Sequence, residues 1–341
     1  MNPENIIISR TDSIGDVVLT LPMAKIIKDH FPGCRVAFLG KEYTRPVIKS
    51  CSYIDQFISL NDFMRKDVLI GNSRPQNIIH VLPSKPVARR AKELGIPLRI
   101  GTANRLFHLT TCNKLVRLSR KKSDLHEAQL NLKLLSPFGI TELFDLQKLQ
   151  GDFGLDRIQP LSPALSKLLD PNRYNLILHP KSQGNGREWG LGNFIALVNL
   201  LDPARFKIFV SGTEAERPLL QPLFEHVKDR VTDITGQMDL YQFMSFIKRA
   251  DGLLASGTGP LHLAAALGRD AFGIFPPIRP IHPGRWAPLG PGVKVFVSPD
   301  SCRDCNKKNA TCHCMSGVQP AEVMSELDSR AGLKARPSQF A

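Results

Sequence analysis

Two kinds of segment in this chain of 341 residues could do chemistry: carboxylates beside a glycine, and glycine-rich loops that carry cations. The first segment, residues 9–17 (SRTDSIGDV), directly follows an apolar run. Asp16 stands at the start of a predicted helix, where a carboxylate either acts in catalysis or only complements the helix dipole. Asp12 is expected to cap that helix. The turn lacks the GxGxxG spacing of a dinucleotide site, which disfavours a dehydrogenase.

The second segment, residues 179–189 (HPKSQGNGREW), combines small polar residues and glycines with two cations. Its backbone N–H groups and the Ser182 hydroxyl could donate to diphosphate oxygens, and Lys181 or Arg187 could balance their charge. A glycine-rich loop can also be only a flexible connection. Two cations in one such loop favour the phosphate interpretation.

The third segment, residues 256–268 (SGTGPLHLAAALG), places Thr258 and Gly259 at the end of a predicted strand. Pro260 suits the first turn of the helix that follows. The free N–H groups of that turn predict a second anion site on the same edge of a sheet. His262 lies about one turn into the helix, so it either serves this site or is structural.

A fourth segment, residues 211–216 (SGTEAE), follows a predicted strand and opens a helix. A carboxylate here could accept hydrogen bonds from ribose hydroxyls. The residues alone favour the other interpretation, an acid in the first turn of a helix.

The chain has seven cysteines, an odd number without an export signal, which indicates reduced thiols rather than a disulfide framework. Four of them follow the pattern C-x2-C-x6-C-x-C and could hold a structural zinc ion, although the C-x-C half is not a standard ligand spacing. These four are Cys302, Cys305, Cys312 and Cys314. No catalytic metal and no cofactor are expected.

The formal net charge is +14, and residues 85–122 contain eleven Lys or Arg residues against a single acid, Glu93. Such a segment attracts polyanions: nucleic acid, an anionic membrane face or a phosphorylated substrate. It could also only keep the protein soluble. Aromatic residues make up 7% of the chain and do not alternate with the cations, so a nucleic-acid-binding protein is disfavoured.

Short apolar runs alternate with amphipathic stretches along the chain, as is typical of βαβ units and a parallel sheet. We predict strands at residues 6–8, 35–39, 54–58, 77–82, 175–178, 206–210, 252–255 and 271–275. We predict helices at residues 16–30, 124–135, 191–201, 214–227, 240–250 and 261–267. A proline-rich stretch, residues 159–173, is the expected linker.

The fold predicted is therefore α/β, with two Rossmann-like domains that face a central cleft. The expected boundaries are residues 1–165 for the first domain, 172–330 for the second and 331–341 for a tail. No apolar run approaches the ~18–20 residues that span a bilayer, and the N-terminus does not look like a signal peptide. We expect no transmembrane segment and a cytoplasmic location.

Taken together, the four segments resemble the ADP-heptose:lipopolysaccharide heptosyltransferases of glycosyltransferase family 9. The matching stretches are RTDSIGDVVLTLP, HPKSQGNGREW, SGTEAE and SGTGPLHLAAALG, in the order that the family keeps. The resemblance implies a GT-B fold, with the acceptor on the first domain and the nucleotide sugar on the second. It also implies metal-independent transfer with inversion at the sugar.

The resemblance assigns roles to individual residues. Asp16 matches the general base that takes a proton from the acceptor hydroxyl. Glu216 matches a ribose-binding acid, and Met238 lies near the expected adenine pocket. The residues that match contacts to the donor diphosphate are Lys181, Ser182, Arg187, Thr258, Gly259 and His262.

The resemblance also gives the basic segment a use, because a precursor of the lipopolysaccharide core carries phosphates and carboxylates at the inner membrane face. Lys85, Arg89 and Arg90 follow a predicted strand end and are the expected acceptor contacts. The partners expected are thus an ADP-sugar and an anionic glycolipid, with a peripheral position on the inner membrane and no nucleic acid.

One position departs from the family pattern. Many members carry Asp directly before the Thr-Gly of the last motif, where it holds sugar hydroxyls, and this chain has Gly257. A transferase that uses another nucleotide sugar therefore stays open as an alternative.

Overall fold

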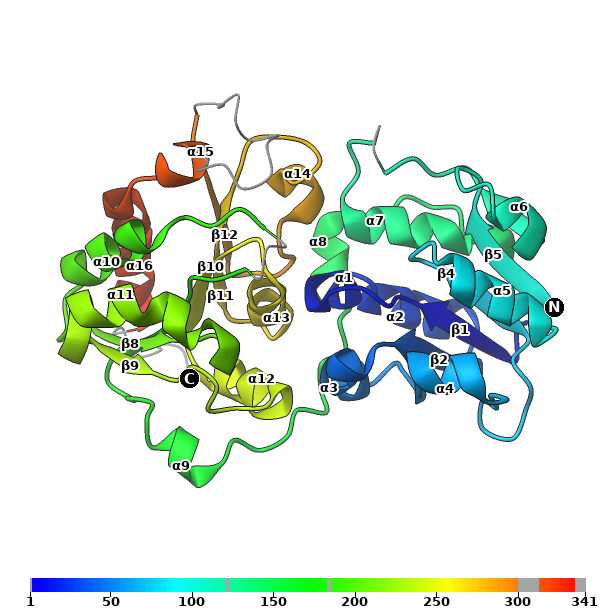
Figure 1. The fold of residues 1–341 in the computed structure, drawn as a ribbon, viewed down its shortest axis with the longest axis horizontal. Helices are drawn as coiled ribbons and strands as arrows, with labels where there is room; N and C mark the ends of the chain where they lie inside the picture. The colour runs from blue at the N-terminus through cyan, green and yellow to red at the C-terminus, as the bar shows by residue number, and fades with distance from the viewer. Residues whose placement is uncertain (1, 121–122, 183–185, 300–312, 335–341) are drawn as a thin grey trace. The chain divides into compact units, whose positions relative to one another are not determined.

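The computed structural model describes residues 2–120, 123–182, 186–299 and 313–334. The chain forms two compact units that meet in sequence between Ile158 and Gln159, at the start of the predicted linker. Each unit is an α/β structure built on one six-stranded sheet in which all paired strands are parallel (Figure 1).

The sheet of unit 1 has the strand order β3-β2-β1-β4-β5-β6. Its strands are β1 (Asn5–Ser9), β2 (Arg35–Gly40), β3 (Gln56–Ser59), β4 (Asn77–His80), β5 (Leu98–Thr102) and β6 (Lys114–Val116). The central strand β1 is fully buried, as its apolar residues predict. The order reverses direction between β1 and β4, so the loops that leave these two strands border the usual ligand crevice of such sheets.

Helices cover both faces of this sheet, and α7 and α4 lie on opposite sides of it in Figure 1. The helices of unit 1 are α1 (Ile14–Val18), α2 (Leu21–His30), α3 (Arg45–Ser50), α4 (Leu60–Arg65), α5 (Lys85–Glu93), α6 (His108–Thr111), α7 (Glu127–Leu132) and α8 (Leu146–Leu149). Short 3₁₀ turns are η1 (Glu42–Thr44) and η2 (Lys133–Phe138).

The single helix predicted at residues 16–30 is wrong, because the chain forms α1 and α2 with a break between them. Pro22, in the first turn of α2, has no N–H, and its ring would clash with the carbonyl of Val18 in a continuous helix. The Thr20 hydroxyl donates to the Asp16 carbonyl at 2.8 Å across the break. The break leaves α1 as a short helix that carries Asp16.

Unit 2 repeats the same topology, with the strand order β12-β11-β10-β7-β8-β9. Its strands are β7 (Tyr174–His179), β8 (Phe206–Val210), β9 (Val231–Asp233), β10 (Gly252–Ser256), β11 (Asp270–Phe275) and β12 (Val293–Val297). Here the order reverses between β7 and β10. The loops after these two strands are the second and third segments singled out in the sequence.

The helices of unit 2 enclose a core that contains Trp189, Phe194 and Phe272. They are α9 (Pro163–Ser166), α10 (Leu191–Leu200), α11 (Arg217–Val227), α12 (Leu240–Arg249), α13 (Gly259–Ala266), α14 (Pro283–Trp286), α15 (His313–Ser316) and α16 (Pro320–Lys334), with 3₁₀ turns η3 (Glu214–Glu216) and η4 (Lys228–Arg230). Helix α16 packs against α10. It continues to Lys334, so the first residues of the predicted tail are helical instead.

The predicted linker is also more ordered than its prolines suggest. It contains α9 and is fastened to α12, because the Ser245 hydroxyl donates to the Gln159 carbonyl at 2.7 Å. The Gln242 side chain also accepts the Ser162 N–H at 2.9 Å and donates to the Pro160 carbonyl at 3.1 Å. The fold class predicted from the sequence, α/β with two Rossmann-like domains, is confirmed.

Candidate active site

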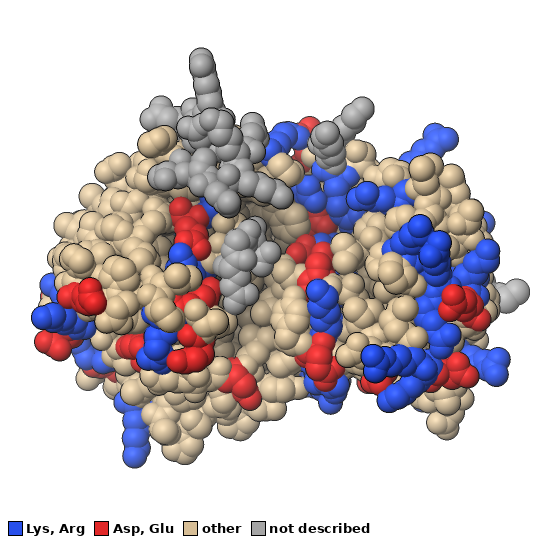
Figure 2. Space-filling model, in the orientation of Figure 1, with Lys and Arg blue, Asp and Glu red and all other residues tan. Residues whose placement is uncertain are grey.

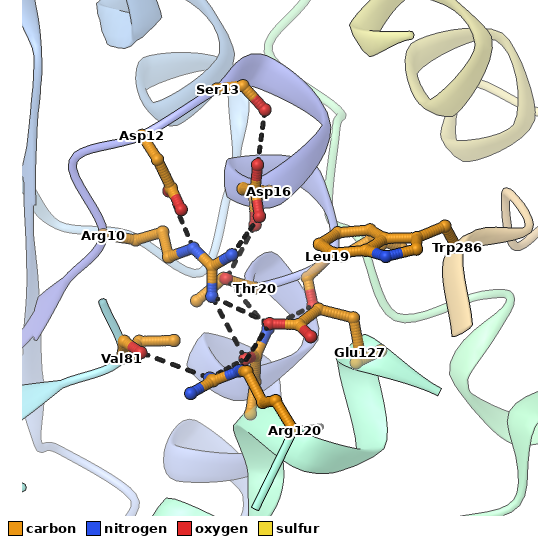
Figure 3. Close-up of polar contacts among 12 residues, drawn as sticks. Arg10, Asp12, Ser13, Asp16, Leu19, Thr20, Val81, Arg120, Glu127 and Trp286 are labelled. Carbon is orange, nitrogen blue, oxygen red and sulfur yellow. Dashed lines mark hydrogen bonds and ion pairs between the residues drawn. The ribbon is translucent and has the colours of Figure 1, made fainter. Parts of the chain in front are cut away.

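Asp16 lies in the first turn of α1, near the carboxyl end of β1. Its carboxylate accepts hydrogen bonds from the guanidinium of Arg10 and the hydroxyl of Ser13 (Figure 3). The side chain is 16% exposed, which leaves part of it accessible. Two donors on one carboxylate fix its direction, as a general base requires, and the position in the first turn also suits the helix dipole.

Arg10 is the centre of this arrangement. It leaves the end of β1 with a side chain that is 4% exposed, and its guanidinium contacts Asp12 at 2.7 Å and Glu127 at 3.1 Å as well as Asp16. Burial alone would lower the pKa of Arg10, but the carboxylates of Asp16, Asp12 and Glu127 raise it above its ordinary value. Arg10 is therefore a permanent cation that joins three carboxylates.

The predicted cap role of Asp12 is wrong. Ser13 occupies the N-cap position of α1, and the Asp12 carboxylate turns instead toward the buried Nε of Arg10. Burial raises the pKa of Asp12 to about 6, despite the nearby Arg10 cation.

A second arginine approaches the same cluster from the other side. The Arg120 guanidinium donates to Glu127 at 2.8 Å, to Asn131 at 2.9 Å and to the Val81 carbonyl at 3.2 Å. Glu127, at the start of α7, is completely buried, so its charge is balanced by the two arginines (Figure 3). Sequence reasoning missed Arg10, Arg120, Glu127 and Asn131 as members of one site. We call these four residues with Asp12, Ser13 and Asp16 the Arg10 cluster.

The three expected acceptor contacts lie on α5. Lys85 and Arg89 are exposed, and Lys85 begins the helix next to the carboxyl edge of the sheet. Arg90 is half-buried and donates to the carbonyls of Phe63 at 3.2 Å and Lys66 at 3.1 Å, which fastens α5 to the α4 region. The structure thus leaves Lys85 and Arg89 open to solvent and gives Arg90 structural contacts.

In unit 2, the loop after β7 contains a carboxylate that the sequence analysis did not single out. Glu188 accepts a hydrogen bond from the Ser182 N–H at 3.0 Å, lies 3.3 Å from the Ser182 hydroxyl and also accepts from Lys181. The predicted phosphate donors, Lys181 and Ser182, are therefore brought together around a carboxylate. Glu188 thus engages two groups that can each donate to an anion.

Glu216 ends the 3₁₀ turn η3, which follows β8, and is 5% exposed. Its Oε2 accepts from the N–H of Thr213 at 2.8 Å and from the Thr213 hydroxyl at 2.9 Å, so it does fill the role of a first-turn acid. Its Oε1 is buried and has no hydrogen-bond partner in the part of the chain that the structure describes. That oxygen can still accept a hydrogen bond from a ligand hydroxyl.

His179 ends β7 close to this acid. Its Nδ1 lies 2.9 Å from the Ser211 hydroxyl. Burial lowers the pKa of His179 to about 4, against the opposing effect of Glu216 and Glu188, so the imidazole is neutral at physiological pH.

Thr258 and Gly259 begin α13 at the carboxyl end of β10, and His262 is buried one turn further on. The hydroxyls of Ser256 and Thr258 are buried without a hydrogen-bond partner among the residues described. Together with the first N–H groups of α13, they offer donors to an anion.

The loops after β7 and β10 come close to each other. A Cβ atom at Gly186 would lie 3.0 Å from the carbonyl oxygen of Gly257, and a Cβ atom at Gly257 would lie 2.9 Å from the Phe275 ring. Phe275 therefore occupies the space beside position 257. The remaining predicted residues are also on this edge: Arg187 is half-buried in the first loop, and Met238 is half-buried between β9 and α12.

The cysteine pattern lies mostly outside the described residues, which include only Cys314, buried at the start of α15. Within the described ranges, no group of three or more His, Cys, Asp or Glu side chains is arranged to hold a metal ion. The structural zinc site stays a prediction from the sequence. No helix of the described chain has both the length and the apolar character needed to cross a membrane.

Comparison with known proteins agrees with this geometry. The profile of glycosyltransferase family 9 (heptosyltransferase) matches residues 87–316. The lipopolysaccharide core heptosyltransferase OpsX of Haemophilus influenzae is 20% identical over 342 residues, which cover 95% of this chain and 94% of that protein.

Solved structures share the fold over nearly the whole chain. The glycosyltransferase family 9 protein of Veillonella parvula has a TM-score of 0.77 at 17% identity, with 97% of this chain and 98% of that chain covered. The Escherichia coli heptosyltransferase WaaC with ADP has a TM-score of 0.71 at 16% identity, with 96% and 99% covered, and WaaC has also been solved with ADP-2-deoxy-2-fluoro heptose. These matches confirm the GT-B fold class. The chain is a glycosyltransferase and belongs to glycosyltransferase family 9, the heptosyltransferase family.

Proposed function

We propose that this chain transfers a heptose from ADP-heptose to the anionic inner core of a lipopolysaccharide precursor, with inversion at the anomeric carbon and without a metal ion. One observation carries the donor assignment. Three buried oxygens have no partner among the described residues: Glu216 Oε1, Ser256 Oγ and Thr258 Oγ1. Glu216 is in the turn η3 after β8, and Ser256 and Thr258 stand where β10 leads into α13, in the same unit. Burying such atoms is costly unless a ligand satisfies them.

The shape of a nucleoside diphosphate suits this edge. Glu216 Oε1 would accept a ribose hydroxyl, and Met238 would lie toward the adenine. The diphosphate would bind at the start of α13 and against the loop of Lys181, Ser182 and Arg187. Among the proteins compared, WaaC is solved with ADP and with an ADP-heptose analogue, which supports an ADP-sugar as the donor of this chain.

The Arg10 cluster supplies the base. Asp16 would take the proton of the acceptor hydroxyl while its oxygen forms a bond to the anomeric carbon. The bond from that carbon to the β-phosphate oxygen breaks, and ADP leaves. Lys181, Arg187 and the first N–H groups of α13 stabilise the charge that develops on the leaving group. Arg10 and Ser13 keep the Asp16 carboxylate in one orientation during the transfer.

The acceptor would bind on unit 1, where exposed Lys85 and Arg89 of α5 attract phosphates and carboxylates of a glycolipid. We place the protein in the cytoplasm, at the inner face of the membrane that carries such a lipid. Replacing Lys85 and Arg89 by Gln should raise the acceptor KM and leave donor binding unchanged; equal loss of both would contradict this assignment.

A second candidate is transfer from another nucleotide sugar, and the pair Gly257–Phe275 favours it. With Gly at position 257 and an aromatic ring beside it, the carboxylate that the family pattern uses for sugar hydroxyls is replaced by an apolar surface. The diphosphate contacts are the same in both cases.

Isothermal titration calorimetry distinguishes the two candidates. ADP-heptose should bind and UDP- or GDP-sugars should not. Arg187→Ala should weaken binding by roughly tenfold, because it removes a charge-assisted contact to phosphate. Arg249→Ala is the matched control, since Arg249 is exposed at the last residue of α12, at the opposite edge of the sheet. Preferential binding of a UDP- or GDP-sugar would transfer the assignment to the second candidate.

A further inference from the structure

Three leucines of unit 1 are exposed within one short stretch of chain. Leu106 is 85% exposed, Leu109 is 59% exposed and Leu115 is 38% exposed. They lie on the β5–α6 loop, on α6 and on the edge strand β6. A single exposed leucine is ordinary, but a group of them at one site indicates a contact surface.

The turn that carries Leu106 and Leu109 is rigidly supported. The N–H of His108 bonds to the Arg105 carbonyl at 2.9 Å, and the N–H of Leu109 bonds to the Leu106 carbonyl at 3.1 Å. Residues three apart in such a turn project on the same side. Beneath it His108 is completely buried, and its Nδ1 accepts the Thr102 N–H at 2.9 Å. The two leucines are thus held outward by a buried anchor.

Cations lie beside these leucines. Lys92 of α5 lies directly beside α6, because its Nζ donates to the Thr110 carbonyl at 2.9 Å. Between residues 85 and 120 the acid is Glu93 alone. Figure 2 shows Lys and Arg side chains gathered over the part of unit 1 where Figure 1 places α5. The exposed cations of this region are Lys85, Arg89, Lys92, Arg105, Lys114 and Arg117.

We propose that these residues form a membrane-docking surface, in which Leu106 and Leu109 insert into the interface of an anionic bilayer and the six cations bind its lipid phosphates. Protruding aliphatic side chains with Lys and Arg beside them match the two layers of such an interface, acyl chains below and headgroups above. Nucleic acid fits less well, because leucines neither stack on bases nor pair with them. We call this the leucine–cation surface.

The inference deepens the proposed function by naming where the chain contacts the membrane of its acceptor. It concerns lipid headgroups and not the sugar donor. Vesicles that contain neither the glycolipid nor a nucleotide sugar therefore test it separately from the transfer reaction.

The test is cosedimentation of the full chain with vesicles of equal parts phosphatidylcholine and phosphatidylglycerol, and with vesicles of phosphatidylcholine alone. The native chain should bind the anionic vesicles and lose binding as salt is raised. Leu106→Ser with Leu109→Ser should weaken that binding by roughly tenfold or more, since two apolar side chains no longer leave water. Replacing Arg105, Lys114 and Arg117 by Gln should weaken it by a similar factor.

Two control variants keep the result specific. Leu143→Ser removes another leucine of unit 1 that is 61% exposed, and Lys148→Gln removes an exposed lysine nearby; both should bind as the native chain does. Circular dichroism checks that every variant is folded. The proposal is overturned if the native chain does not bind anionic vesicles, if it binds neutral vesicles equally well, or if the leucine variant binds as tightly as the native chain. The last result, combined with binding to a single-stranded oligonucleotide, would indicate a site for soluble polyanions instead.

Discussion

Glu127→Gln is expected to destabilise unit 1 by about 3 kcal/mol. The carboxylate of Glu127 is completely buried and lies 3.1 Å from Arg10 and 2.8 Å from Arg120. Hydrogen bonds to charged groups contribute about 1.5–3 kcal/mol each, and removing one partner of a buried ion pair costs about 3–5 kcal/mol. Glutamine keeps one acceptor oxygen but presents N–H groups to a guanidinium, so we place the effect at the lower end.

The assay is urea unfolding and differential scanning calorimetry of the full chain, with Glu142→Gln as the control because Glu142 is exposed. For a unit of this size, a loss of 3 kcal/mol corresponds to a decrease of about 6–12 °C in the Tm of the transition that belongs to unit 1. The same variant should lower kcat, since Arg10 loses one of the three carboxylates that hold it beside Asp16. A change in stability within about 0.5 kcal/mol of the control would refute the view that the buried Glu127 carboxylate balances Arg10 and Arg120.

Three further predictions concern Glu188 and Gly257 of unit 2 and the buried His80 of unit 1. Glu188→Gln should lower the Kd for ADP by roughly threefold to tenfold at low salt, because the carboxylate that engages Lys181 and Ser182 no longer competes with the diphosphate. Calorimetry checks this, with the exposed Glu225→Gln as a control that should bind ADP as the native chain does. Weaker binding of ADP by Glu188→Gln alone would instead make Glu188 a positioning residue. Burial lowers the pKa of His80 to about 3. Between about pH 6.5 and pH 3 the unfolded chain therefore binds a proton at His80 that the folded chain does not. The free energy of unfolding thus falls as the pH decreases through this range, by about 2 kcal/mol at pH 5. His80→Leu should remove that part of the slope in urea titrations, and an unchanged slope would contradict the assignment. Gly257→Ala should cost about 1–3 kcal/mol through overpacking against Phe275, and Phe275→Leu in the same chain should restore most of it; equal loss in both backgrounds would argue against this contact.

The alternation of apolar and polar runs was enough to predict the α/β class and most of the strands. β1 was the easiest, because Ile6, Ile7 and Ile8 form an uninterrupted apolar run in the middle of a sheet. Four strands, β5, β6, β9 and β12, were missed. Three of them, β6, β9 and β12, are edge strands, and charged residues such as Arg99 in β5 and Lys114 in β6 interrupt the apolar pattern.

The candidate site was predictable only where its residues share one loop. Asp16, Lys181, Ser182 and Thr258 lie in motifs whose residue types indicate their chemistry. In the Arg10 cluster, Arg10 and Glu127 are 117 positions apart in the sequence. No local sequence pattern indicates that the Glu127 side chain is buried against Arg10. Glu188 stands inside the predicted loop, but its contact with Lys181 depends on how that loop folds.

The most direct test of the central claim is transfer itself. The purified chain is incubated with ADP-heptose and a lipopolysaccharide inner-core precursor, and the product is analysed by mass spectrometry. Native protein should add one heptose and release one ADP, and Asp16→Asn should bind ADP-heptose normally in calorimetry but form product at least about a hundredfold more slowly. Product formation by Asp16→Asn at the native rate, or transfer from a UDP- or GDP-sugar in place of ADP-heptose, would contradict the account.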